Sequence, residues 1–445
     1  MSMFMKIKVR EALSKAACSL LALAMVAGPS FANETATLSI KSIPNVDVRM
    51  YGFVENDLIN DSAQGLTEEL DNASVAKAST WAGQHHNTLM SVRNSRLGFD
   101  ITMPKTEYGL ETEGIFEMDF LGNPSATAQR DIYNNALMRV RHAYINITDD
   151  QWNGKIGQTW SLLGWQPYYF PSEAIVQPAV GQLYRRFSQM RVTNTQKLMD
   201  GDWTLESAVD TARPPELQSG VMEEHAGVRL ASTKMKAVSG LGSSTPMVGL
   251  SAAVSGALIP IRTNAGNANG TVVAFDALVP IIQSSDGKNP SNTLSLVGEY
   301  SNGRGYGGLE LAGAASGLSA FTDTTGSGAA LDSGMASKSA NGNLDLIHYQ
   351  TYRTNLTYML PGAHWAASVG YAETQTLNMR DYAAAAGNID RYQYYYGNVM
   401  FLPLTWLRFA LEWAQIKDTY TNQGTGTNDR FAYDNRIQFT TYLTF

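Results

Sequence analysis

The sequence predicts an all-β protein, a transmembrane antiparallel β-barrel of about 16 strands with short periplasmic turns and long extracellular loops. Three observations support this expectation. The C-terminal residues alternate between apolar and polar side chains, many similar segments precede them, and short and long connections alternate between the segments. Alternation with a period of two is typical of a strand with one apolar and one polar face. In a membrane barrel these faces meet lipid and lumen.

Residues 1–32 are predicted to form a signal peptide, and residues 33–445 the outer-membrane barrel domain. Basic residues come first, a mostly apolar stretch follows, and small residues precede a cleavage site near Ala32. The apolar stretch is shorter than the roughly 20 residues of a membrane-spanning helix. Cys18, the only cysteine of the chain, lies in this segment, so we expect no disulfide and no cysteine metal site in the mature domain.

Candidate strands follow along the chain as runs with alternating faces that are bounded by turn residues. In the first half they are 47–57, 90–103, 107–119, 137–147, 153–162, 185–196, 203–211 and 225–234. In the second half they are 246–257, 271–281, 293–303, 346–359, 363–375, 389–402, 405–417 and 433–445. A further short strand at 306–313 remains an open alternative. It would make the number of strands odd. An even number of strands is typical of bacterial outer-membrane barrels.

The connections between these strands alternate in length. Residues 104–106, 360–362 and 403–404 are short turns, whereas 163–184 and 304–345 are long loops. Outer-membrane barrels have this asymmetry, with tight periplasmic turns and long external loops. Both termini are therefore expected on the periplasmic side.

The last predicted strand shows the alternation most clearly. Ile437, Phe439, Leu443 and Phe445 fall on one face, and polar side chains such as Arg436 fall on the other. A strand of this kind that ends on an aromatic residue is similar to the closing strand of an outer-membrane barrel. We therefore expect Phe445 to act as the assembly signal that barrel-assembly machinery recognises.

The charged residues of the predicted strands are expected to face the lumen. In 107–120 the acidic residues Glu111, Glu113 and Glu117 alternate with apolar side chains. A charge that faces lipid at mid-depth costs about 2–4 kcal/mol, so these carboxylates should form an acidic part of the pore wall. A barrel of about 16 strands is too wide to be filled by its own side chains and holds water.

By the same parity a set of arginines faces inward. They are Arg96, Arg139, Arg141, Arg191, Arg229, Arg353 and Arg436, together with Arg391 and Arg408. A guanidinium group offers a planar fork that matches a carboxylate, so this set could line a path for anions. Alternatively, the arginines only neutralise the acidic residues of neighbouring strands. The sequence leaves both interpretations open.

The loop 163–184 is rich in aromatic residues and proline. It contains Trp165, Tyr168 and Tyr169, and its only acidic residue is Glu173. A stiff loop between the fifth and sixth strands could fold into the lumen and narrow it. The alternative is an external loop that packs on itself or on a neighbouring subunit.

Other chemistry is not indicated. The formal net charge is −7, whereas nucleic acids select clustered positive charge. The six histidines have no spacing typical of a metal enzyme, and no nucleophile-elbow motif occurs. We expect no cofactor, no metal and no enzymatic activity. Glu55, Asp57 and Asp61 could bind calcium, but we expect them to be solvated loop residues.

Several segments of the predicted first six strands together resemble the DcaP-like outer-membrane porins. These segments are RNSRLGF (93–99), EMDFLG (117–122), RVRHAY (139–144), GKIGQTWS (154–161) and RRFSQMR (185–191). The family consists of trimeric channels associated with dicarboxylic acids. The resemblance implies an inward set at Arg96, Arg139, Arg141 and Arg191, and a homotrimer.

We therefore expect a porin in the outer membrane of a Gram-negative bacterium, in contact with membrane lipid and lipopolysaccharide. It would pass small hydrophilic solutes by diffusion and prefer organic anions. Two alternatives remain. One is a barrel closed by its loops that acts as an adhesin or assembly component, and the other is a barrel-borne hydrolase.

Overall fold

The computed structural model describes residues 37–39, 45–68, 75–122, 137–171, 173–174, 180–213, 220–240, 247–263, 266–307, 336–338, 344–378, 389–421 and 430–445. The predicted signal peptide and most of the possible strand 306–313 lie outside these residues. In the described part of the chain, no helix has the length and apolar character needed to cross a membrane.

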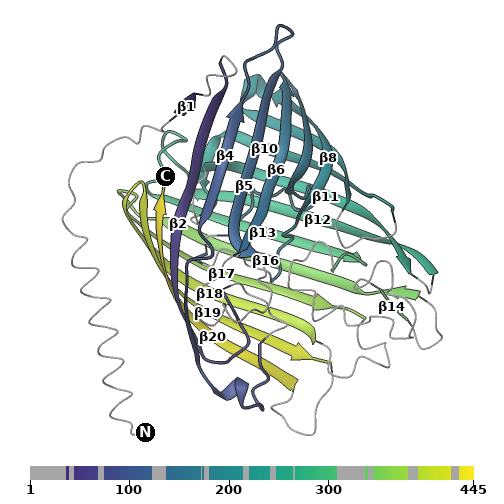
Figure 1. Cartoon of the computed structure of the whole chain (residues 1–445), viewed down its shortest axis with the longest axis vertical. Coiled ribbons are helices and arrows are strands. Elements are labelled where there is room, and N and C mark those ends of the chain that lie inside the picture. The colour runs from purple at the N-terminus through teal and green to yellow at the C-terminus, as the bar shows by residue number, and fades with distance from the viewer. Residues whose placement is uncertain are drawn as a thin grey trace.

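The described chain forms a closed antiparallel β-barrel (Figure 1). Its first strands are β1 (Thr37–Ser39), β2 (Asp47–Asp61), β3 (Asn87–Ser91), β4 (Arg96–Thr102), β5 (Glu111–Gly122), β6 (Leu137–Asp149), β7 (Trp152–Trp160), β8 (Arg186–Leu198) and β9 (Trp203–Arg213). The next are β10 (Glu223–Val238), β11 (Met247–Thr263), β12 (Gly266–Ile282), β13 (Thr293–Arg304), β14 (Ala336–Lys338) and β15 (Leu344–Leu346). The last are β16 (His348–Met359), β17 (Trp365–Thr376), β18 (Ile389–Leu404), β19 (Leu407–Tyr420) and β20 (Phe431–Thr444). Two short 3-10 helices, η2 (Ala82–Gln84) and η4 (Met199–Gly201), lie in connections.

Sixteen strands go round the barrel, as predicted, and the predicted fold class is confirmed. The second of them is interrupted, because β3 and β4 both pair with β2 and are separated by residues 92–95. Each of the other predicted strands corresponds to one strand of the barrel. The short β1 pairs with β2 in addition, and β14 pairs only with β15.

The barrel closes where its first and last strands meet. In Figure 1 the purple β2 runs beside the yellow β20, and their register extends from Phe53 opposite Thr444 to Asp61 opposite Arg436. Beyond this ladder, Phe445 N donates to Gly52 O and Gly52 N donates to Phe445 O, both at 3.0 Å. The backbone of the C-terminal residue is therefore part of the seam.

The two faces of β20 differ as the alternation requires. Ile437 and Leu443 are exposed on the outer face, whereas Arg436, Gln438 and Thr440 are buried on the inner face. Exposed large apolar side chains occur on the outside of most other strands as well, for example Ile156 and Val192. The outer surface thus has the apolar character that a lipid contact requires.

A β-bulge in β6 changes which side chains face the lumen. The register between β5 and β6 shifts after Glu117, which stands opposite His142, while the next residue, Met118, stands opposite Val140. Arg141 is the extra residue, and its side chain and that of His142 both lie against Glu117. A bulge inserts one residue and re-aims the side chains that follow it. From His142 onward the inward parity of β6 is therefore inverted.

The expectation that Glu55, Asp57 and Asp61 are solvated loop residues is wrong. All three lie in β2 and are fully buried. Asp57 accepts hydrogen bonds from Asn94 Nδ2 at 2.8 Å and Thr440 Oγ1 at 2.7 Å. β2 continues beyond residue 57, so these acids belong to the inner wall.

Candidate functional site

The described residues between β7 and β8, which are 161–171, 173–174 and 180–185, lie inside the barrel and contact strands far along the sequence. Trp165 Nε1 donates to Val254 O of β11 at 3.2 Å. Leu183 N donates to Glu299 Oε1 of β13 at 2.6 Å. Further backbone N–H groups of this loop donate to β11, β17 and β19, at Ser255 Oγ, Thr374 Oγ1 and Glu412 Oε2. The described part of the loop is therefore held against β11, β13, β17 and β19.

An ion pair and a hydrogen bond fix the middle of the loop. Glu173 pairs with Arg353 of β16, and both side chains are almost completely buried. Arg353 Nη1 also donates to Gln182 Oε1 at 3.1 Å, so one guanidinium holds two parts of the loop. Tyr442 of β20 donates through its hydroxyl to Ala174 O at 2.9 Å.

Apolar side chains of the loop pack against the part of the inner wall formed by β9 to β20. Leu163, Val180 and Leu183 of the loop belong to one buried cluster with Ile259 of β11 and Tyr394 of β18. A second cluster joins Trp165 and Tyr169 to side chains of β9, β11, β12 and β13. The opposite half of the wall, from β2 to β8, carries the polar pocket described next.

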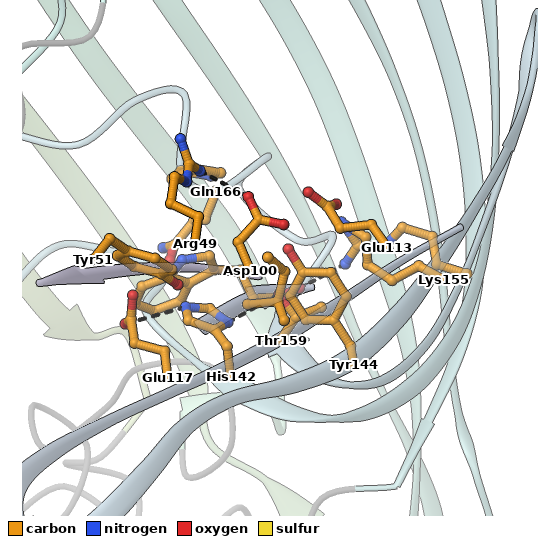
Figure 2. Close-up of a pocket in the computed structure, with 14 residues that line it drawn as sticks. Arg49, Tyr51, Asp100, Glu113, Glu117, His142, Tyr144, Lys155, Thr159 and Gln166 are labelled. Carbon is orange, nitrogen blue, oxygen red and sulfur yellow. Dashed lines mark hydrogen bonds and ion pairs between the residues drawn. The ribbon is translucent and has the colours of Figure 1, made fainter. Parts of the chain in front are cut away.

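A pocket of about 320 Å³ lies between these strands and the loop (Figure 2). Its polar and aromatic lining residues are Arg49, Tyr51, Asp100, Glu113, Glu117, His142, Tyr144, Lys155, Thr159, Trp160, Gln166 and Arg191. In Figure 2 His142 stands between Glu117 and Thr159, at 3.9 Å and 3.1 Å. Gln166 comes from the loop, so the loop forms one side of this pocket.

Three of the predicted arginines meet two carboxylates of β5. Arg139 donates to Asp119 from Nη2 at 2.8 Å, and Arg141 donates to Glu117 at 2.7 Å and to Asp119 at 2.9 Å. Arg96 Nε lies 3.5 Å from Glu117. Arg141 is nearly inaccessible, with 2% of its side chain exposed, whereas Arg139 is 29% exposed.

A fourth guanidinium, that of Arg186, joins this group. Its Cζ lies 4.7 Å from the ring centre of Trp160, and the Cζ of Arg141 lies 5.9 Å from the same ring. Arg139 and Arg96 are electrostatic neighbours as well. Within the described part of the chain Arg186 has no ion-pair partner, and its buried Nη1 has no hydrogen-bond acceptor. We call Arg96, Arg139, Arg141 and Arg186 the arginine cluster.

The other predicted arginines with an acidic partner among the described residues are Arg191, Arg229, Arg353, Arg391 and Arg436. Arg191 Nε donates to Asp210 Oδ2 at 3.1 Å, and His225 Nδ1 lies 2.6 Å from the other oxygen of that carboxylate. Arg229 pairs with Glu206, and Arg436 Nε donates to Asp61 Oδ1 at 2.7 Å. Together with the Arg353–Glu173 pair, these contacts show guanidinium groups that neutralise neighbouring acids.

The aromatic residues of the loop take part in the same network. The Arg229 guanidinium lies 3.7 Å from the ring centre of Tyr168, whose hydroxyl lies 3.4 Å from Glu206 Oε1. Burial raises the pKa of the Tyr168 hydroxyl, and burial also raises that of Tyr169. Both phenols therefore remain neutral at physiological pH.

The predicted acidic wall is divided among three environments. Glu111 lies at the exposed end of β5 and pairs with Lys105 at 3.1 Å. Glu117 is held by the arginine cluster, whereas Glu113 lines the pocket. The three residues therefore differ in their surroundings although their spacing is regular.

Sequence reasoning missed three residues of this site: Lys155, His142 and Arg186. Lys155 has inward parity in β7, so a search for every inward cation, and not only arginine, would have found it. His142 faces inward only because of the bulge at Arg141, and no sequence pattern predicts that bulge. Arg186 begins β8 opposite Trp160, where parity within the strand gives no guide.

Comparison with known proteins places the fold among outer-membrane porins. The structure of the outer membrane channel DcaP of Acinetobacter baumannii matches with a TM-score of 0.64 and 17% identity, over 92% of this chain and 100% of that chain. An anion-selective porin from Comamonas acidovorans matches with a TM-score of 0.51 and 11% identity, over 90% and 100%. No protein-family model and no curated protein sequence matches. At these identities the likeness is one of fold.

Proposed function

We propose that the protein is a DcaP-like porin of the outer membrane that passes small hydrophilic solutes by diffusion, with a preference for organic anions such as dicarboxylates. The observation that carries the proposal is the Arg186 guanidinium, whose Nη1 is buried without a hydrogen-bond acceptor and which has no ion-pair partner among the described residues. It lies between the rings of Trp160 and Tyr184, with its Cζ 4.7 Å and 5.8 Å from their centres, and Trp160 lines the pocket.

The charge balance of the arginine cluster supports an anion preference. Its four guanidinium groups face two carboxylates, Glu117 and Asp119, so positive charge is in excess. A carboxylate that passed could accept hydrogen bonds from a planar fork. Because Arg96, Arg139 and Arg141 are already paired, such binding would be weak, and permeation requires sites that release the ion.

The fold supports a channel of this kind. A barrel of this size encloses more space than its own side chains fill, and the loop covers only part of the inner wall. One of the barrels with a similar fold is named as an anion-selective porin. We extend the proposal to removal of a signal peptide near Ala32, insertion by barrel-assembly machinery, contact with lipopolysaccharide, and a homotrimer.

The test is the reversal potential of the refolded protein in a planar bilayer under a salt gradient. Discrete conductance steps with anion preference are expected, and Arg186→Gln should reduce that preference. The matched control is Lys234→Gln, which removes a cation from an exposed pair with Asp202. This control should leave the reversal potential unchanged.

Two results would contradict the proposal. Cation preference in the unaltered protein would mean that the acidic residues of the wall determine the ion selectivity. A folded barrel without conductance would favour the closed-lumen alternative, for which the apolar packing of the loop across the barrel is the relevant observation.

A further inference from the structure

The pocket beside the loop contains one cation and one anion that form no ion pair of 4.0 Å or less with any described residue. Arg49 pairs with Asp100 at 2.7 Å, Glu117 pairs with Arg141, and Arg191 pairs with Asp210. Lys155 and Glu113 form no ion pair of 4.0 Å or less in the described chain, either with each other or with a third residue. The pocket therefore offers two charges of opposite sign to a solute.

The register of the strands fixes how far apart these two charges are. Glu113 of β5 stands opposite Asn146 of β6, and Asn146 stands opposite Lys155 of β7. All three side chains lie on the inner face, and the two charged residues are separated by two strand spacings, roughly 10 Å at the backbone. Figure 2 shows both at one end of the pocket, above Tyr144.

The anionic side of the pocket is reinforced by Asp100. Asp100 of β4 is a diagonal neighbour of Glu113, which stands opposite Thr102. Its Oδ2 accepts from Arg49, but its buried Oδ1 has no hydrogen-bond donor in the described chain. Of the two carboxylates Arg49 contacts Asp100 alone, so these neighbours share one close guanidinium among the described residues, and Glu113 has no ion pair of its own. A ligand ammonium group is the chemistry that this position favours.

The cationic side is formed by Lys155. Its Nζ lies 4.8 Å from the ring centre of Tyr144, and it stands opposite Arg191, whose charge Asp210 neutralises. An ammonium group with free donors binds a carboxylate readily. A volume of about 320 Å³ suits a small organic molecule.

We propose that this pocket binds a zwitterionic α-amino acid, with the ligand ammonium at Glu113 and Asp100 and a ligand carboxylate at Lys155. The inference rests on the proposed function, because the pocket lies on the solute path of the proposed channel. It adds a second class of solute to the organic anions. Among amino acids, the arginine cluster would favour acidic ones such as glutamate.

The test compares glutamate with glutarate, which has the same carbon chain and lacks the ammonium group. The measurement is the concentration of each solute that halves the ionic current through single channels in a bilayer. Glu113→Gln should raise the half-blocking concentration of glutamate about tenfold, because it removes a charged hydrogen-bond partner. It should leave that of glutarate unchanged or lower. Lys155→Met should raise both values.

Glu111→Gln is the matched control, since Glu111 lies on the same strand but pairs with Lys105 at the exposed end. It should change neither value, and heat-dependent migration on gels would show that each variant folds. An equal effect of Glu113→Gln on both solutes, or no effect on either, would overturn the zwitterion site and leave the porin intact. Glutamate binding measured by calorimetry in a barrel that does not conduct would instead overturn the proposed function and keep the pocket.

Discussion

Arg353 of β16 and Glu173 of the inward loop form an ion pair in which only 3% and 1% of the side chains are exposed. The pair joins the loop to the wall opposite the pocket. Arg353 also donates to Gln182, so it connects two segments of the loop to one strand. This side chain therefore holds the described part of the loop against β16.

Arg353→Ala should release the loop and increase single-channel conductance. Removal of one partner leaves the other charge buried, which destabilises by about 3–5 kcal/mol. Single-channel recording would measure the change, with Lys105→Ala as a control because its pair with Glu111 is exposed. Conductance equal to that of the unaltered protein would show that the loop does not depend on this pair.

Gly52→Ala should weaken the barrel seam. A Cβ at Gly52 would lie 2.2 Å from Arg96 O, a backbone atom that cannot move away easily. Overpacking of this kind costs about 1–3 kcal/mol, so the urea midpoint of unfolding should fall. At Gly114 the added Cβ would meet Ile101 Cβ at 3.8 Å, an ordinary contact, and Gly114→Ala should leave the midpoint nearly unchanged. Equal midpoints for the two variants would count against the close approach at Gly52.

Glu68→Gln should destabilise the protein at neutral pH and not at acidic pH. Burial acts to raise the pKa of Glu68, but hydrogen bonds from its own backbone N–H and from the Ser91 hydroxyl, together with the Arg93 guanidinium, outweigh it and lower the pKa. Because the folded-state pKa is depressed, the stabilisation is complete above the unfolded pKa and is lost as pH falls through the folded value.

We expect the loss from Glu68→Gln to be about 1 kcal/mol at pH 7. Urea unfolding of both proteins at neutral pH and near pH 3 would check it, and the two curves should converge at the lower pH. A difference that persists in acid would mean that the carboxylate charge is not the cause.

Deletion of Phe445 should reduce the amount of folded barrel in the outer membrane without altering secretion. The deletion removes two backbone hydrogen bonds to Gly52 and the aromatic end of the chain. Heat-modifiable protein in the outer-membrane fraction would be quantified. Phe445→Tyr, which keeps both the backbone and the ring, should assemble normally. Normal assembly of the deletion variant would show that Phe445 is not an assembly signal.

The strands were predictable because their side chains repeat with a simple period. The alternation in β20 shows which side chains face outward before any coordinate is known, and the turn residues delimit most strands within a few positions. Interruptions of the period were not predictable. The break between β3 and β4 and the bulge at Arg141 both depend on how a neighbouring strand pairs.

The candidate site was predictable in composition but not in its pairing. Parity placed Arg353 and Arg229 on the inner wall, yet their partners Glu173 and Glu206 are set by the path of the loop and by the register of β9 and β10. Lys155 differs from the pocket residues Arg49 and Arg191 in having no ion pair of 4.0 Å or less in the described chain, and this difference is visible only in the folded structure.

The contacts that hold the loop have a consequence for how the protein matures. The loop lies between β7 and β8, but its hydrogen-bond partners include Glu412 of β19 and Tyr442 of β20, which are synthesised last. A folding intermediate in which β19 and β20 have not yet paired would lack these hydrogen-bond partners. The inner wall therefore reaches its final packing only after β19 and β20 have docked.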